Sequence, residues 1–121
     1  MYNEKISKII NKLTLDASNI NKSPSYVMVE AYDKEKFNKN ILVKCNVKYE
    51  DAFKYWFNDS NLTDKLFKSI KEIVGDPINI YEVTKKEFKK IEKDSMFYFL
   101  EDVYVVEYNN YYIYYLIGNN E

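Results

Sequence analysis

The stretch that decides the fold lies near the carboxyl end of the chain, where residues 103–117 have the sequence VYVVEYNNYYIYYLI. Valine, isoleucine and tyrosine are favoured in strands, and both halves of the stretch are rich in them. Between the halves, Asn109 and Asn110 can form a two-residue turn, because asparagine tolerates a positive φ better than other non-glycine residues. The stretch therefore predicts a β-hairpin in which Tyr104 faces Tyr115.

Alternation along the two strands sorts the hairpin side chains onto two faces. The face with an aliphatic centre is expected to pack against helices, and its members are Val103, Val105, Glu107, Tyr112, Tyr114 and Leu116. The other face is rich in tyrosine and is expected to be partly exposed; its members are Asp102, Tyr104, Val106, Tyr108, Tyr111, Ile113, Tyr115 and Ile117.

Apolar periodicity predicts the remaining elements. Helical spacing indicates helices over 4–16, from a cap at Asn61 or Thr63 to Val74, and over 84–93, with a short aromatic helix over 50–58. Strands are indicated over 26–32, 41–49 and 78–83, with an extra strand at 96–100. We expect one α+β domain over residues 1–121: a mostly antiparallel sheet, helices packed on one face, and the hairpin at the carboxyl end.

The composition excludes several kinds of chemistry. All 18 basic residues are lysine, and the absence of histidine and arginine removes catalytic triads, histidine metal sites and arginine fingers. Two glycines cannot supply a glycine-rich phosphate loop. The single cysteine, Cys45, lies in an apolar row and is interpreted as a small core residue. We therefore expect a protein that is not an enzyme and binds no cofactor or metal ion.

The same residues bear on location. One cysteine cannot form an internal disulfide, which fits a reducing compartment. The amino terminus lacks the apolar stretch of a secretory signal, and the longest apolar run, residues 111–117, is far shorter than the ~20 residues of a membrane span. We expect a cytoplasmic protein with no membrane partner.

Charge is unevenly distributed along the chain. Residues 94–121 hold five of the 19 carboxylates and no lysine, which leaves all 18 lysines and 14 carboxylates to the first 93 residues. Tyrosine is favoured at protein interfaces and carboxylates select a cationic partner. The candidate partner-binding residues are Glu101, Asp102, Tyr104, Tyr108, Tyr111 and Tyr115. The structural alternative is that these tyrosines only form cross-strand pairs that stabilise the sheet.

The end of the chain resembles a group of known proteins. The block FYFLEDVYVVEY at 97–108, with LIGNNE at 116–121, is similar to the endings of small immunity proteins of bacterial polymorphic-toxin and contact-dependent inhibition systems. The resemblance implies a cytoplasmic antitoxin that binds one cognate toxin, often a nuclease, and occludes its active site without chemistry. A nuclease surface is basic because its substrate is polyanionic, so an acidic, tyrosine-rich inhibitor would suit it.

Two other functions stay open on the residues. A single-stranded nucleic-acid-binding protein could use Lys44, Lys48 and nearby aromatic residues, but the tyrosine cluster lies among carboxylates rather than cations. A small enzyme with carboxylate chemistry would need an enclosed pocket with convergent acids, whereas adjacent Glu101 and Asp102 diverge on a strand. An exposed edge strand could also pair with a second copy of the chain.

Overall fold

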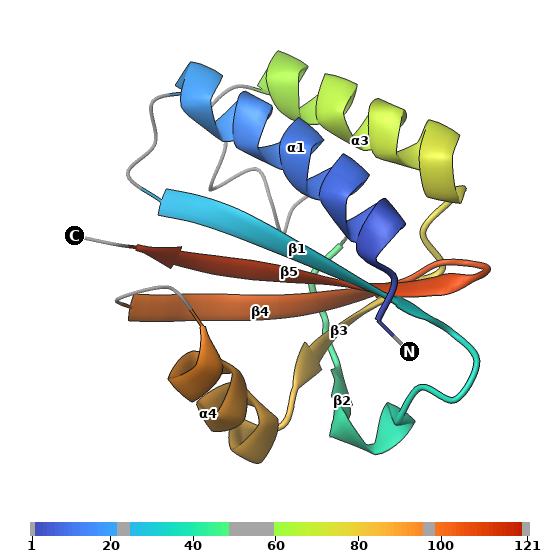
Figure 1. Cartoon of the computed structure of the whole chain (residues 1–121), viewed down its shortest axis with the longest axis vertical. Helices are drawn as coiled ribbons and strands as arrows, with labels where there is room; N and C mark the ends of the chain where they lie inside the picture. Colours follow the sequence, from blue (N-terminus) through green and yellow to red (C-terminus); the bar gives the residue numbers. More distant parts are fainter. Residues whose placement is uncertain (1, 22–24, 49–59, 96–98, 120–121) are drawn as a thin grey trace.

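The computed structural model describes residues 2–21, 25–48, 60–95 and 99–119, and its five strands form one antiparallel sheet in the order β1-β5-β4-β3-β2 (Figure 1). The elements in chain order are α1 (Glu4–Asn21), β1 (Ser25–Asp33), the 3-10 turn η1 (Lys39–Ile41), β2 (Leu42–Lys44), α3 (Ser60–Val74), β3 (Asn79–Val83), α4 (Lys85–Asp94), β4 (Phe99–Glu107) and β5 (Tyr111–Asn119). The α+β class with a carboxyl-terminal hairpin is therefore confirmed.

The hairpin forms in the predicted register. Strands β4 and β5 pair so that Tyr104 lies opposite Tyr115, and the Tyr108 N–H donates to the Tyr111 carbonyl at 2.8 Å to close the turn. The pairing shifts by one residue between Leu100 and Asp102, where a β-bulge interrupts the ladder. The hairpin occupies the middle of the sheet, because β1 pairs with the far side of β5 and β3 with the far side of β4.

Both faces of the sheet are covered. Helices α1 and α3 bury Ile10 and Ile70 against one face. The expectation that all helices pack on this one face holds for these two helices only. The shorter helix α4 packs Phe88 and Ile91 against the opposite face, next to residues of the loop after β1 such as Phe37. The hairpin therefore contributes to two apolar clusters, one on each side.

Two helix ends lie where the sequence predicts them, at the start of α4 and at the end of α3. Helix α3 begins at Ser60, so neither Asn61 nor Thr63 is its cap, and α1 continues beyond residue 16 to Asn21. The Thr84 hydroxyl accepts from the Glu87 N–H at 3.3 Å and caps α4. Gly75 has a φ of +90° directly after α3, which is the left-handed conformation that ends a helix.

Three predicted segments differ from the observed elements or lie partly outside the described residues. The strand expected over 41–49 is present only as β2, from Leu42 to Lys44. Phe99 and Leu100, from the expected strand at 96–100, are the first residues of β4. The short helix expected over 50–58 lies outside the described residues.

The outer edge of β1 is occupied by side chains of α1. The buried Ser7 hydroxyl accepts from the Ala31 N–H at 2.7 Å, and the Asn11 side-chain oxygen accepts from the Val29 N–H at 3.1 Å. The Asn3 N–H donates to the Ala31 carbonyl at 2.7 Å. Ser7 and Asn11 lie four apart and therefore share one side of α1, and Asn3 directly precedes the helix. They satisfy backbone groups that would otherwise be open to pairing with another chain.

A second polar group ties the loop after β1 to the hairpin. The Lys34 ammonium lies 2.6 Å from a Glu107 carboxylate oxygen and donates to the Tyr108 carbonyl at 3.3 Å. Asn79 and Tyr81 also donate to Glu107, at 3.1 and 3.3 Å. Burial alone would raise the pKa of Glu107, but the hydrogen bonds and the Lys34 charge outweigh it and lower the pKa below its usual 4.5.

We expect Ser7→Ala to lower the free energy of unfolding by about 1–3 kcal/mol, because the buried Ala31 N–H loses its acceptor. Urea denaturation measures the effect. Lys8→Ala is the matched control on the same helix, since the Lys8–Glu4 ion pair is largely exposed, and its effect should stay below about 0.5 kcal/mol. Equal effects of the two changes would show that the Ser7 hydroxyl does not protect the edge of β1.

Glu107→Gln tests the polar group. Because the folded-state pKa of Glu107 lies below 4.5, the carboxylate contributes stability that is present above pH 4.5 and is lost as the pH falls through the folded value. The native chain should be more stable than the variant at pH 7, and the difference should shrink as the pH is lowered below about 4.5. Denaturation curves between pH 7 and pH 3 measure it. A difference that does not change with pH would contradict the assignment.

Candidate protein-binding surface

Two of the expected partner-binding residues lie in the core. Tyr108 and Tyr115 are 0% and 1% exposed, in the cluster that α1 and α3 cover, and their hydroxyls lie 3.1 Å apart. The expectation that this tyrosine-rich face is partly exposed is therefore wrong. Both hairpin faces are apolar enough to be buried, and the two longer helices pack on the one that carries these rings. Because the phenol pair satisfies polar atoms internally, the rings can lie deep in the core.

Tyr111, also expected at the surface, lies beside the hairpin turn. Its side chain is half-buried and packs against the same cluster of apolar residues as Tyr115. It therefore belongs mainly to the packing of the core and offers a partner only part of its ring.

The other three expected residues lie together near the start of β4. Glu101 is the residue at the β-bulge and is exposed, Asp102 follows it half-buried, and Tyr104 is half-buried with part of its ring accessible. A bulge leaves one residue unpaired and re-aims the side chains around it. The structure thus keeps Glu101, Asp102 and Tyr104 as surface candidates.

Strand pairing adds a fourth residue that the sequence analysis did not identify. Tyr81 of β3 pairs with Val105 of β4, so Glu82 and Tyr104 are the next neighbours across the two strands. Glu82 is exposed. We call Glu82, Glu101, Asp102 and Tyr104 the acidic strip. No local signal marks Glu82, because its place in the strip depends on the register between two distant strands.

Burial and the neighbouring charges of the acidic strip disfavour ionisation of the Tyr104 phenol further. Burial, followed by the charges of Asp102, Cys45 and Glu82, raises the pKa of Tyr104 to about 12. Burial also raises the pKa of Asp102 above its usual 3.8. At neutral pH the strip therefore presents an uncharged tyrosine hydroxyl next to carboxylates, and both kinds of group accept hydrogen bonds from a cationic partner.

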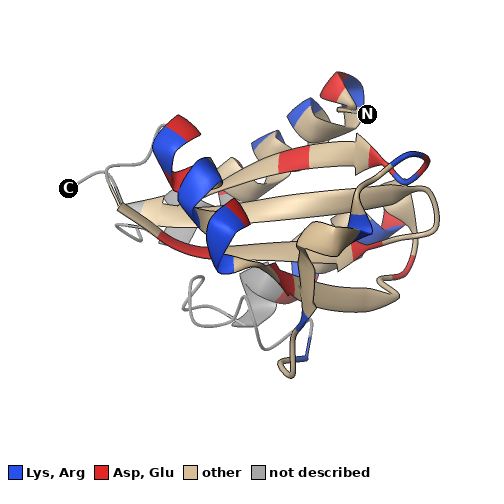
Figure 2. Cartoon of the chain, turned by 90° about the horizontal axis from the view of Figure 1, so that it is seen from below, with Lys and Arg blue, Asp and Glu red and all other residues tan. Residues whose placement is uncertain are grey.

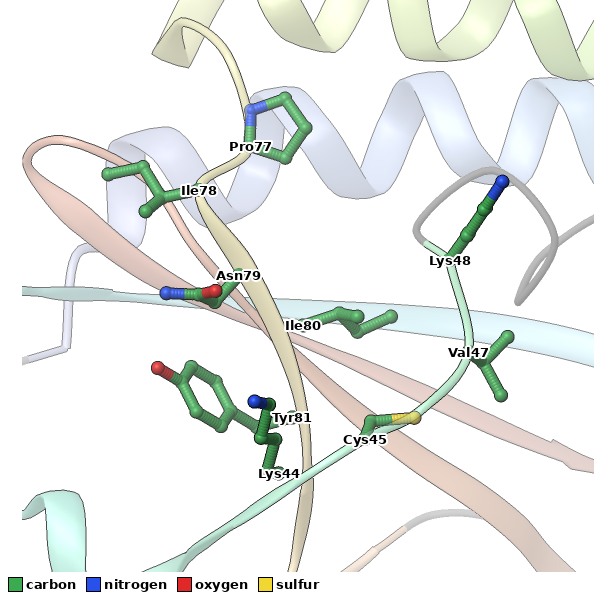
Figure 3. A pocket seen from close by; sticks show the side chains of 9 residues that line it. All are labelled: Lys44, Cys45, Val47, Lys48, Pro77, Ile78, Asn79, Ile80 and Tyr81. Atoms are coloured by element: carbon green, nitrogen blue, oxygen red, sulfur yellow. The ribbon is translucent and has the colours of Figure 1, made fainter.

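A groove lies beside the acidic strip. Strands β2 and β3 pair only as far as Lys44 opposite Tyr81, and beyond this pair they diverge around a hollow of about 540 Å³ (Figure 3). We call this hollow the β2–β3 groove; its walls are Lys44, Cys45, Val47, Lys48, Pro77, Ile78, Asn79, Ile80 and Tyr81. Both lysines of the nucleic-acid alternative line it. The half-buried Cys45 packs against the core, as its apolar row indicates.

The lysines of α4 form a separate exposed face. Figure 2 shows that basic residues crowd this helix, whereas short acidic stretches interrupt the neighbouring strands. Lys85, Lys86, Lys89 and Lys90 are all exposed, and three carboxylates alternate with the lysines along α4. This pattern is typical of a solvated helix surface. It supplies charged positions away from the strip and the groove.

Comparison with family models, with curated proteins and with solved structures gave no match for this chain. Among the described residues, no helix is long and apolar enough to cross a membrane. The same residues contain no group of three or more cysteine or acidic side chains placed to hold a metal ion. The functional interpretation therefore rests on the acidic strip and the groove.

Tyr115→Ala tests the burial of the tyrosine-rich face. Removing a fully buried aromatic ring should cost about 3–5 kcal/mol of unfolding free energy, because transfer and cavity costs add. Chemical denaturation measures the change. Tyr111→Ala is the control at a half-buried position of the same strand and should cost clearly less. A cost for Tyr115→Ala below about 0.5 kcal/mol, as expected of an ordinary surface substitution, would contradict the burial.

Proposed function

We propose that this chain is a cytoplasmic, non-enzymatic immunity protein that binds and neutralises a cognate bacterial toxin through the acidic strip. The observation that carries the proposal is the arrangement around Tyr104, whose partly accessible ring and neutral hydroxyl lie between carboxylates of two neighbouring strands. The resemblance of residues 97–108 to the endings of immunity proteins supports the same conclusion and covers three of the four residues of the strip.

The composition of the strip suits a basic protein surface. A half-buried tyrosine gives large contact area at a small entropic cost, and such residues are enriched among interface anchors. Surrounding carboxylates speed association with a cationic partner and select against acidic ones. A toxin that cleaves nucleic acid presents a basic active surface, and a protein that covers this surface inhibits the toxin without a chemical step.

The position of the strip also favours tight binding. Asp102 and Tyr104 of β4 pair with Ile117 and Tyr115 of β5. Glu82 of the neighbouring strand β3 pairs with Val43 of β2. Side chains on paired strands are held more precisely than side chains on loops, so less freedom is lost when a partner binds.

The decisive experiment needs the toxin. The gene immediately upstream is expected to encode a large secreted protein with a variable carboxyl-terminal toxin domain. Expression of that domain in a bacterial host should arrest growth, and co-expression of this chain should restore it. Asp102→Lys combined with Tyr104→Ala should abolish the rescue and weaken binding in a calorimetric titration by a few kcal/mol, on the order expected for lost interface anchors.

A matched control separates the strip from general charge effects. Asp64→Lys combined with Glu72→Lys changes two exposed carboxylates of α3, outside the strip, and should leave rescue and affinity unchanged. The proposal fails if the strip variant binds the toxin as tightly as the native chain does. It also fails if the neighbouring domain neither arrests growth nor binds the native chain.

A further inference from the structure

We propose that the β2–β3 groove binds an extended, acidic and apolar segment of a second protein, which lies beside β3 as an added strand. This site is separate from the acidic strip and selects the opposite charge. It adds a second contact surface to the chain whether or not the strip binds a toxin.

The backbone of β3 faces the groove at Ile80. Backbone groups alternate in direction along a strand, so the Ile80 N–H lies on the same side as that of Thr84, which donates to the Ile41 carbonyl across the β2–β3 ladder at 2.9 Å. The ladder ends at Lys44 opposite Tyr81. Within the described residues no strand pairs with Ile80 on this side, so its backbone groups are placed to pair with an incoming segment.

The groove also exposes apolar side chains. Val47 and Ile78 are 41% and 50% exposed and line the groove from its two walls. Figure 3 shows Ile80 pointing toward residues 45–48, where its side chain is buried in the core cluster and forms the floor between these two walls. One exposed aliphatic side chain needs no explanation, but two on the walls of one hollow provide an apolar contact surface for a partner.

The walls of the groove also carry positive charge. The described residues of the groove walls include Lys44 and Lys48 and no carboxylate, and both lysines are exposed. Among the described residues neither lysine forms an ion pair, whereas Lys8, Lys34 and Lys71 each have a carboxylate within 3.0 Å. Two exposed lysines four residues apart favour carboxylates on an extended segment that runs along the wall.

A protein segment fits these walls better than a nucleic acid does. Single strands bind on platforms of several aromatic rings in a basic channel. Among the described residues that line the groove, Tyr81 is the one aromatic residue, and its hydroxyl donates to Glu107. Aliphatic walls next to a strand edge suit alternating apolar and acidic side chains instead.

Fluorescence anisotropy of the full chain tests the groove with two labelled six-residue probes, one alternating valine and glutamate and the other alternating valine and lysine. We expect the glutamate probe to bind at least about tenfold more tightly, because it meets Lys44 and Lys48. Lys44→Glu with Lys48→Glu should reverse the preference. Lys85→Glu with Lys89→Glu makes the same charge change on α4 and should leave both affinities within about twofold.

Further variants test the geometry. Ile78→Ser should weaken binding of the glutamate probe several-fold, because apolar contact is lost. Circular dichroism should confirm that each variant is folded. Probes that each carry one methylated backbone nitrogen test strand pairing. Methylation should weaken binding where the N–H faces β3 and leave it unchanged at the next position, where the N–H points away.

Three results would overturn the inference. The probes could bind equally and ignore the change at Lys44 and Lys48. A single-stranded oligothymidine could bind through these lysines while the glutamate probe does not, which would assign the groove to nucleic acid. Concentration-dependent dimerisation abolished by the same double change, without probe binding, would assign it to a second copy of the chain. Because no toxin is used, these results are independent of the proposed immunity function.

Discussion

The burial of the central hairpin on both faces is the constraint on which the rest of the structure depends. Every polar atom in such a strand pair must find its partner inside the protein. Tyr108 and Tyr115 meet this requirement by placing their hydroxyls 3.1 Å apart, and Glu107 meets it through Lys34, Asn79 and Tyr81. These contacts hold the loop after β1 and the start of β3 against the hairpin. On the β2 side the described strands diverge after Lys44, opposite Tyr81, and the sheet is open there.

Much of this fold follows from short-range rules. The two asparagines fix the hairpin turn, and the turn fixes the register of β4 against β5, so Tyr104 lies opposite Tyr115 as predicted. Helical periodicity places α1 and α3, while Thr84 and Gly75 mark a helix start and a helix end. Each of these features depends on residues within a few positions of one another, and that is the range over which sequence patterns act.

The surface depends on contacts between distant segments, and there the sequence is a weaker guide. Alternation separates Tyr108 from Tyr112 correctly, but it does not tell which face the longer helices cover, because the two faces are similarly apolar. The bulge at Glu101 and the neighbouring Glu82 follow from pairing between β3, β4 and β5. The divergence of β2 after Lys44 is likewise invisible in a segment whose alternation continues to residue 49.

Polar residues at the start of α1 bind the outer edge of β1, so the two edges of the sheet differ. Asn3, Ser7 and Asn11 occupy the backbone groups of Val29 and Ala31, whereas the β2 side offers a diverging strand pair. When the backbone groups at one edge of a sheet are occupied, a strand can add only at the other edge. If a segment adds beside β3 as we propose, strand pairing would not continue past Val29 and Ala31 at the opposite edge of the sheet, where side chains of α1 already bind the backbone N–H groups.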